Sequence, residues 1–194
     1  MLTRKTCLTA SIRRRAKLTS ESQTPAPVPE AAAQLEFARR IALDLLAVRQ
    51  RSRYELSAAL RRRGVPDEVA SELLGRLGEV GLVDDAAFAE TVTTSRSQFG
   101  MRGRARIRQE LQAKGVDRAT VEAALAELDP ESERAAALAL AYRRARSMGQ
   151  LDRQVARRRL AGVLARRGYA PGIVAAVVGE VLNDPAVEFS TGEQ

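Results

Sequence analysis

The chain has 194 residues, with 32 Lys and Arg against 24 Asp and Glu, which gives a formal net charge of +8. It contains no His and one Cys, Cys7. This composition excludes a disulfide framework and removes the commonest general base and metal ligand. The basic balance favours an acidic partner, either nucleic acid or an acidic protein surface. We expect no enzyme activity, no cofactor and no metal. We also expect no membrane partner, because no apolar run reaches the ~18 residues of a membrane helix.

Residues 1–34 are predicted to be a disordered, basic and proline-rich extension. The stretch TPAPVPE, residues 24–30, alternates proline with other residues, which is typical of a linker. The residues before it are basic and hydroxyl-rich, a composition that organelle transit peptides share. Besides a transit peptide, this stretch can be interpreted as a disordered extension or as the result of a misplaced start codon. The Ala, Arg and Val bias of the chain resembles that of a high-GC bacterial gene and favours these alternatives.

From residue 35 onward the apolar residues follow helical spacing and no segment shows sustained strand alternation, so the sequence predicts an all-α fold. The first predicted helix covers 35–48, and its apolar stripe consists of Leu35, Ala38, Ile41, Leu45 and Val48. Helices of the same kind are predicted at 86–98 and 134–146. Each of these three helices precedes a pair of further helices.

Three segments end a helix in the same way: LRRRGV at 60–65, LQAKGV at 111–116 and LARRGY at 164–169. When they are aligned on Gly64, Gly115 and Gly168, apolar residues coincide four and eight positions before the glycine and ten and thirteen after it. Each glycine is expected to adopt the left-handed conformation that ends a helix.

The sequence therefore predicts three tandem three-helix repeats, stacked into an elongated, curved body. We place the repeats at 35–85, 86–133 and 134–184, with a C-terminal tail at 185–194. One such unit has too little core to be very stable alone. Stacking the units creates a long continuous face.

The stretch GMRGRARIRQEL, residues 100–111, has arginine at every second position. Placed on the second helix of the middle repeat, Arg104 and Arg108 occupy one flank and Arg102 and Arg106 the other. Each like-charge pair costs roughly 0.2–0.5 kcal/mol, and the helix dipole at this end favours anions. No acid occurs between Thr91 and Gln109. We therefore expect these arginines to bind a partner instead of stabilising the helix.

Two other interpretations stay open for the arginines: a solvated basic face, or structural ion pairs with Glu90 or Glu122. The repeat alignment favours binding, because the position eleven before the glycine is arginine in every repeat: Arg53, Arg104 and Arg157. The third repeat is more basic still, with ten arginines and one acid between residues 134 and 167.

Other motifs are weak. GMRG, residues 100–103, has the form of the RNA-binding loop of KH domains, but that fold needs strands. Asp84 and Asp85 could form a pair of catalytic carboxylates, but directly before a helix an N-cap is the more frequent role of Asp. The chain has no glycine-rich phosphate loop of the Walker type.

Several stretches resemble the RecX family, the regulatory proteins of the RecA recombinase. They are GLVDDAAFAE (81–90), the following SRS and Gly100, ARIRQELQAKGV (105–116) and LARRGY (164–169). The resemblance covers about residues 38–184 and is most specific in the middle repeat. Thr91 stands where an aromatic residue is common in the family.

The resemblance implies an all-helical chain of three three-helix repeats that binds the RecA–DNA filament along its helical groove. It implies an inhibitor that limits filament extension and restrains ATP hydrolysis, strand exchange and coprotease activity. RecA protein and the RecA–DNA filament are the implied partners. Some affinity for DNA phosphates is implied as well. We expect a monomer located in the cytoplasm.

The resemblance and the charge pattern together select nine candidate binding residues. Those carried over from the family motif are Arg96, Arg102, Arg104, Arg106, Arg108 and Lys114, and those added from the other repeats are Arg53, Arg153 and Arg157. The alternative function is a general basic nucleic-acid-binding module. The basic segments contain few aromatic residues to stack on bases: Phe99, Tyr142 and Tyr169, the last expected in the core. That scarcity weighs against the alternative.

Overall fold

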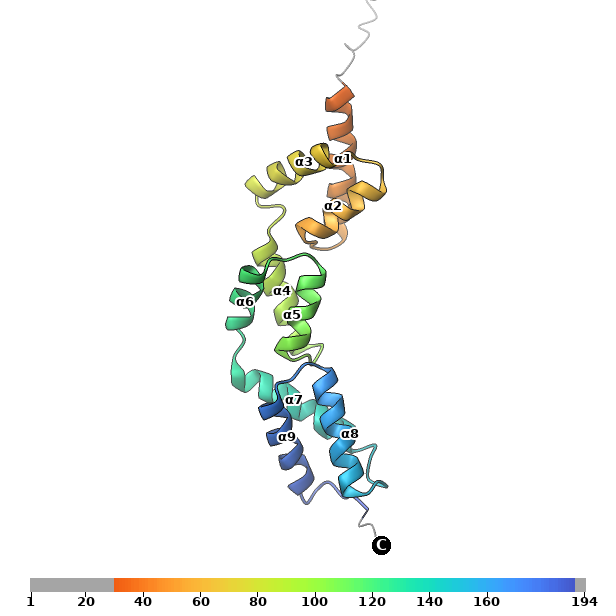
Figure 1. Cartoon of the computed structure of the whole chain (residues 1–194), viewed down its shortest axis with the longest axis vertical. Helices are drawn as coiled ribbons and strands as arrows, with labels where there is room; N and C mark the ends of the chain where they lie inside the picture. The colour runs from red at the N-terminus through yellow and green to blue at the C-terminus, as the bar shows by residue number, and fades with distance from the viewer. Residues whose placement is uncertain (1–29, 191–194) are drawn as a thin grey trace, which may run out of the picture.

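The computed structural model describes residues 30–190. This part of the chain consists of helices joined by turns and loops, with no β-strand. The first repeat contains α1 (Glu30–Val48), α2 (Arg53–Arg62) and α3 (Asp67–Glu79). The second contains α4 (Asp85–Gln98), α5 (Arg104–Ala113) and α6 (Arg118–Ala126). The third contains α7 (Pro130–Ala145), α8 (Arg153–Arg166) and α9 (Pro171–Asn183). Figure 1 shows the three groups following one another along one long axis, which confirms the elongated all-α repeat fold.

The helix ends follow the local sequence. Gly64, Gly115 and Gly168 have φ angles of 79°, 74° and 86°, which confirms their predicted left-handed conformation. Asp84 is the N-cap of α4, as expected, because its carboxylate accepts hydrogen bonds from two backbone amides of the first turn. Ser52 and Glu55 form a capping box at the start of α2.

Three predicted boundaries differ from the structure. Helix α1 begins at Glu30, five residues before the predicted boundary, because three alanines and a first-turn acid continue the helix toward Pro29. Helix α7 begins at Pro130, since Asp129 caps it. Residues 185–190 are not a free tail, because Val187 and Phe189 pack against the third core. The rest of the predicted extension, residues 1–29, lies outside the described residues.

Each repeat has a core of its own. Leu60, Leu111 and Leu164, the equivalent leucines before the glycines, are fully buried, each in a different cluster. Tyr169 also lies in the third core, as predicted. The contacts between repeats must therefore come from residues outside these cores, and these residues determine the shape of the stack.

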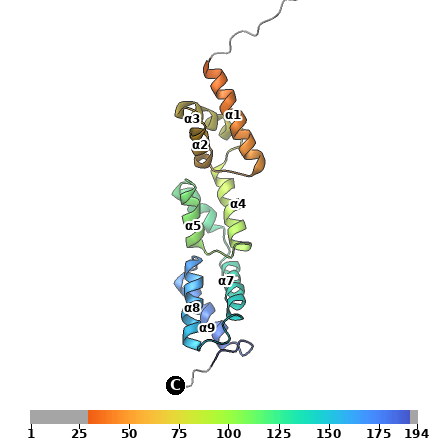
Figure 2. The ribbon, with the colours of Figure 1, turned by 90° about the vertical axis from the view of Figure 1, so that its right-hand side faces the viewer.

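The second helices of the three repeats form a helical column, in which α8, α5 and α2 follow one another end to end. Figure 2 shows these helices along one side of the molecule and α1, α4 and α7 along the other. The C-terminal turn of α8 meets the N-terminus of α5, and the C-terminal turn of α5 meets the N-terminus of α2. The basic residues selected from the sequence lie largely on this column.

Candidate binding surface

The junction between the second and third repeats brings two glycines into contact. The Gly103 amide donates to the carbonyl of Arg167 at 2.9 Å, and the Ala105 amide donates to that of Gly168 at 3.2 Å. A Cβ at Gly103 would lie 2.4 Å from the Gly168 carbonyl oxygen, and one at Gly168 would lie 2.3 Å from the Arg106 nitrogen. The turn that ends α8 thus satisfies backbone donors that begin α5, and only glycine allows this approach.

The junction between the first and second repeats uses the equivalent turn. The Ser52 hydroxyl donates to the carbonyl of Lys114 at 2.6 Å, and a Cβ at Gly115 would lie 2.3 Å from the Cβ of Tyr54. Gly64, the same position in the first repeat, has no atom of the described residues within 4 Å of its would-be Cβ. The repeated glycine therefore serves both the helix end and the stacking of repeats.

Arg104 lies within the second junction and binds a carboxylate from the third repeat. Its Nε donates to Glu133 at 2.8 Å and its backbone amide to the same carboxylate at 3.0 Å. Its guanidinium also donates to the carbonyls of Leu125, at 2.9 Å, and Leu128. The Glu133 side chain is only 6% exposed. The positive end of the α5 helix dipole therefore does have an anion beside it. That anion is Glu133 of α7, 29 residues along the chain.

Arg96 and Arg102 share a second carboxylate. Arg96 binds Glu110 at 2.9 Å, and Arg102 binds the same side chain. Burial raises the pKa of Glu110, but the Arg96 hydrogen bond and the nearby cations outweigh it and lower that pKa overall. Arg102 lies in the loop before α5 and not on the helix as predicted, because Met101 has a φ of 46° and Gly103 is the N-cap residue. The predicted helical pair of Arg102 and Arg106 does not form.

Arg108 and Lys114 are also paired. Arg108 binds Glu122 at 2.6 Å, one of the two acids named in the ion-pair interpretation. Lys114 binds Glu55 of the first repeat at 2.9 Å. Burial raises the pKa of Glu55, but hydrogen bonds from Arg49 and Lys114 outweigh it and lower the pKa to about 2. The expectation that the charge of the arginine stretch is not neutralised locally is therefore wrong for every member except Arg106.

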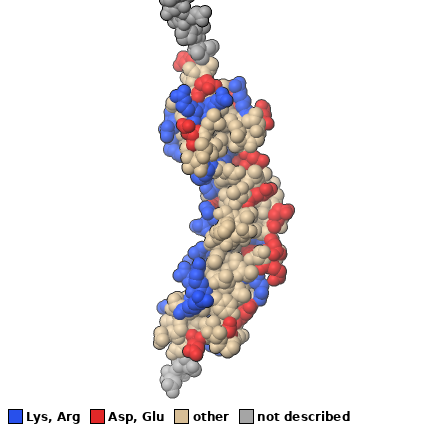
Figure 3. Space-filling model, turned by 180° about the vertical axis from the view of Figure 1, so that it is seen from behind, with Lys and Arg blue, Asp and Glu red and all other residues tan. Residues whose placement is uncertain are grey.

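The guanidinium groups of four of the nine candidates have no carboxylate partner within residues 30–190, and all four residues are exposed: Arg53, Arg106, Arg153 and Arg157. Arg158, Arg159 and Arg166 of α8 are exposed and likewise unpaired in this range. Figure 3 shows Lys and Arg along one long edge of the second and third repeats, and Asp and Glu mostly along the opposite edge. We call the edge formed by α5 and α8 the basic edge.

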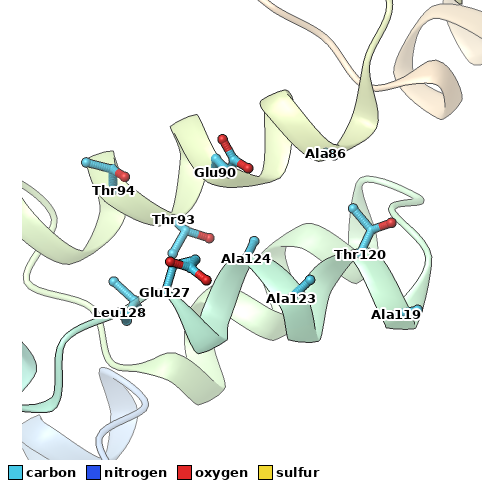
Figure 4. Close-up of a pocket in the computed structure, with 10 residues that line it drawn as sticks. All are labelled: Ala86, Glu90, Thr93, Thr94, Ala119, Thr120, Ala123, Ala124, Glu127 and Leu128. Carbon is cyan, nitrogen blue, oxygen red and sulfur yellow. The ribbon is translucent and has the colours of Figure 1, made fainter.

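A hollow away from the basic edge lies between α4 and α6. It measures about 730 Å³, and its lining includes Glu90, Thr93 and Glu127. Figure 4 shows Thr93 reaching from α4 toward α6, close to Glu127, with alanines along α6. No group of acids, His or Cys within residues 30–190 is arranged to hold a metal ion. Within the same range, no helix has the length and apolarity needed to cross a bilayer.

Sequence reasoning named Glu122 as a possible partner of the arginines but missed Glu110 and Glu133. The partners Glu110, Glu122 and Glu133 lie 14, 14 and 29 residues from Arg96, Arg108 and Arg104. No helical periodicity links positions so distant, so composition near the arginines could not reveal these pairs. The only available signal was the S-x-x-E pattern at Ser52, which predicts the position of Glu55 but not its bond to Lys114.

Three family models match the chain in order. They are the first, second and third three-helix domains of RecX, at residues 38–77, 84–125 and 131–178. Two solved structures have a similar fold. One is RecX from Lactobacillus salivarius, with a TM-score of 0.71 and 21% identity over 77% of this chain and 97% of that one. The other is a regulatory protein RecX with a TM-score of 0.66 and 24% identity, covering 76% of this chain and 72% of that one.

Two curated relatives are similar over most of their length. The regulatory protein RecX of Amycolatopsis mediterranei is 44% identical over 151 residues, which are 78% of this chain and 86% of the relative. The regulatory protein RecX of Mycolicibacterium smegmatis is 41% identical over 181 residues, which are 88% of this chain and 95% of the relative. Identity of this extent, together with three matching domains in order, places the chain in the RecX family of regulatory proteins.

Proposed function

We propose that this chain inhibits RecA by binding the RecA–DNA filament along its groove. Bound there, it limits filament extension and restrains ATP hydrolysis, strand exchange and coprotease activity. It acts as a cytoplasmic monomer and catalyses no reaction itself. Membership of the RecX family supports RecA as the partner.

The basic edge carries the proposal. Exposed arginines without carboxylate partners keep their charge available for an external anion. The planar guanidinium presents forked donors that match phosphate and carboxylate oxygens. An elongated chain can follow a groove and contact several successive subunits or phosphates. Arg106, Arg153 and their unpaired neighbours on α8 are the contacts that we propose.

The paired residues have a different role in this proposal. Arg96, Arg102, Arg104, Arg108 and Lys114 are bound to carboxylates of the chain itself. Contacting a filament through these guanidinium and ammonium groups would require giving up part of those bonds. Arg104 and Lys114 therefore connect neighbouring repeats, and the other three brace the second repeat, an arrangement that presents the basic edge.

A RecA ATPase titration tests the proposal. The parent chain should inhibit the DNA-dependent ATPase, and Arg158→Gln with Arg159→Gln should weaken inhibition about tenfold, because two phosphate or carboxylate contacts are lost. The salt dependence of inhibition should also become less steep. The matched control is Arg39→Gln with Arg40→Gln on α1, which removes two exposed charges away from the basic edge. If the parent chain leaves the ATPase unchanged, the proposed function is wrong.

One observation favours the alternative of a nucleic-acid-binding module. Phe99 is 83% exposed and lies between Arg96 and Arg102 in the sequence, where it could stack on an unpaired base. Binding to single-stranded DNA without RecA, measured with and without Phe99→Ala, separates the two functions. A loss of DNA affinity together with unchanged ATPase inhibition would assign Phe99 to direct DNA binding and the basic edge to the filament.

A further inference from the structure

The third repeat contains an apolar groove between its second and third helices. The groove measures about 500 Å³ and lies along α8 and α9, which Figure 1 shows side by side. Its lining includes Arg157, Ala161, Ala165, Tyr169, Val174 and Ala175. Arg157 is its only charged lining residue. A concave apolar surface with one fixed charge is the usual form of a binding pocket.

In the second repeat, an ion pair bridges the equivalent surface between the second and third helices, α5 and α6. Alignment on the repeated glycines places Arg108 at the position of Ala161, and Glu122 at the position of Ala175. Arg108 and Glu122 bind each other at 2.6 Å from α5 to α6. The third repeat has alanine at both positions, so no side chain reaches across.

The first repeat has a charged pair across this place as well, at two different positions. Arg61 of α2 binds Asp67 of α3 at 3.0 Å, and these residues align with Ala165 and Pro171. The remaining hollow there, about 440 Å³, is lined by polar residues such as Ser57 and Ser71 and by Gly115 of the next repeat. Two repeats thus present a polar, bridged surface to solvent, whereas the third presents small apolar side chains.

Tyr169 adds a polar atom beneath the groove. Its side chain is 4% exposed, and its hydroxyl has no hydrogen-bond partner within the described residues. The equivalent residues are the valines Val65 and Val116, which are buried at 5% and 4% exposure and carry no polar atom. Burial raises the pKa of Tyr169 to about 12, further supported by Glu133, so the hydroxyl remains a donor at neutral pH. Among the described residues, the wall of this groove therefore contains a buried hydroxyl that the equivalent valines of the other two repeats lack.

The chemistry of the lining selects the occupant. Small alkyl side chains fit an aliphatic or aromatic side chain, and Arg157 at the rim fits a carboxylate next to it. A nucleobase fits poorly, because Tyr169 is the one aromatic residue of the lining and is too deeply buried for a base to stack on its ring. The neighbouring Arg153 and Arg158 add to the preference for an acidic partner.

We propose that the α8–α9 groove binds an acidic protein segment, whose apolar side chain enters the groove beside a carboxylate held by Arg157. This inference rests on the proposed function, since it assigns the protein part of the RecA filament to the groove and the phosphates to the other arginines of the basic edge.

The first test maps binding on the full chain with labelled alanine and valine methyl groups. The probe is a short peptide of Asp and Glu residues with one central Phe. We expect the methyl signals of Ala161, Ala165 and Val174 to shift, and the same peptide with Ala in place of Phe to bind about tenfold more weakly. No shift with the Phe peptide, or equal affinity for both peptides, overturns the proposal. Shifts of these methyls with a single-stranded oligonucleotide instead would assign the groove to nucleic acid and also overturn it.

The second test copies the ion pair of the second repeat into the third. Ala161→Arg with Ala175→Glu leaves the net charge unchanged and fills the groove with a pair that the fold already accommodates at Arg108 and Glu122. This variant should lose the peptide-induced shifts. Tyr169→Phe, which removes only the buried hydroxyl, should keep the fold and bind the peptide as the parent chain does, and so serves as the matched control. Unchanged binding by the filled-groove variant would refute the groove.

The filled-groove variant also separates this inference from the proposed function. If the parent chain inhibits the RecA ATPase and the filled-groove variant inhibits equally well, the groove proposal fails while the function stands. If the parent chain does not inhibit at all, the function fails, whatever the peptide does. The expected result is inhibition by the parent chain that the filled-groove variant weakens about tenfold.

Discussion

At the scale of single residues, an arginine on the surface of this chain can have either of two roles. Arg104 and Arg106 lie two residues apart at the start of α5, yet Arg104 binds the buried Glu133, whereas the Arg106 guanidinium has, among residues 30–190, only Gln109 within hydrogen-bond distance, at 3.4 Å. The first arginine connects two repeats and the second is available to a partner. Because the sequence gives both residues the same neighbours, only the fold distinguishes them.

This difference predicts opposite results for two matched substitutions. Arg104→Gln leaves the Glu133 carboxylate buried without its cation and should lower the free energy of unfolding by about 2–3 kcal/mol. Arg106→Gln should change it by less than about 0.5 kcal/mol. Urea denaturation followed by circular dichroism measures both values. Equal stabilities of the two variants would show that the ion pair with Glu133 contributes little in solution.

Glu55 predicts a pH dependence with a defined sign. Its pKa in the folded chain is about 2, below the ordinary value of 4.5, so its ionised form stabilises the folded state. That contribution is complete above the unfolded pKa and is lost as the pH falls from about 4.5 toward 2. Glu55→Gln keeps the capping box but removes the charge. The variant should be less stable by on the order of 2 kcal/mol at pH 7.

The difference in free energy of unfolding between the parent chain and Glu55→Gln should narrow below pH 4 and disappear near pH 2. Denaturant unfolding at a series of pH values measures it. Glu72→Gln is the control, because the bond of Glu72 to Arg76 is exposed on a single helix and should contribute little at any pH. If this difference in free energy stays constant with pH, Glu55 stabilises the fold through its packing and hydrogen bonds and not through its charge.

At the scale of helices and turns, the repeated glycine explains both the success and the limit of sequence analysis. Three equivalent glycines predict three helix ends, since a left-handed φ is a local property that the residue type reveals. Their second role depends on what lies opposite each turn. Gly115 and Gly168 contact the preceding repeat, whereas Gly64 faces open space. Core leucines were predictable for the same local reason, but ion pairs between distant segments were not.

Substitution by alanine separates the two roles. Gly64→Ala should cost about 1 kcal/mol, which is the penalty for a Cβ in a left-handed residue. Gly168→Ala should cost at least about 3 kcal/mol, because its Cβ would also lie 2.3 Å from a backbone nitrogen of α5. Calorimetry of both variants gives the comparison. Similar melting temperatures would mean that the turn can move away from α5 without loss.

At the scale of the whole molecule, the repeats stabilise one another through the small sets of contacts at the junctions between them. The three cores are separate, and that of the middle repeat has fewer buried members than either neighbour. In such a stack the total stability is approximately the sum of repeat terms and nearest-neighbour terms. The middle repeat, with a junction at each end, depends most on these contacts. The elongated shape that exposes a long basic edge therefore requires intact junctions.

Hydrogen exchange should reveal this dependence as a local effect. In Gly168→Ala, protection should fall for Ile107 and Leu111 of the second core and for Leu160 of the third, because the junction between them is weakened. Leu56 and Leu60 in the first repeat lie beyond the other junction and should keep most of their protection. Glu55→Gln should produce the mirror pattern, with losses in the first and second repeats and little change at Leu160 and Leu164. If either substitution lowered protection uniformly from end to end, the chain would unfold as one cooperative unit, and the junctions would be as strong as the cores.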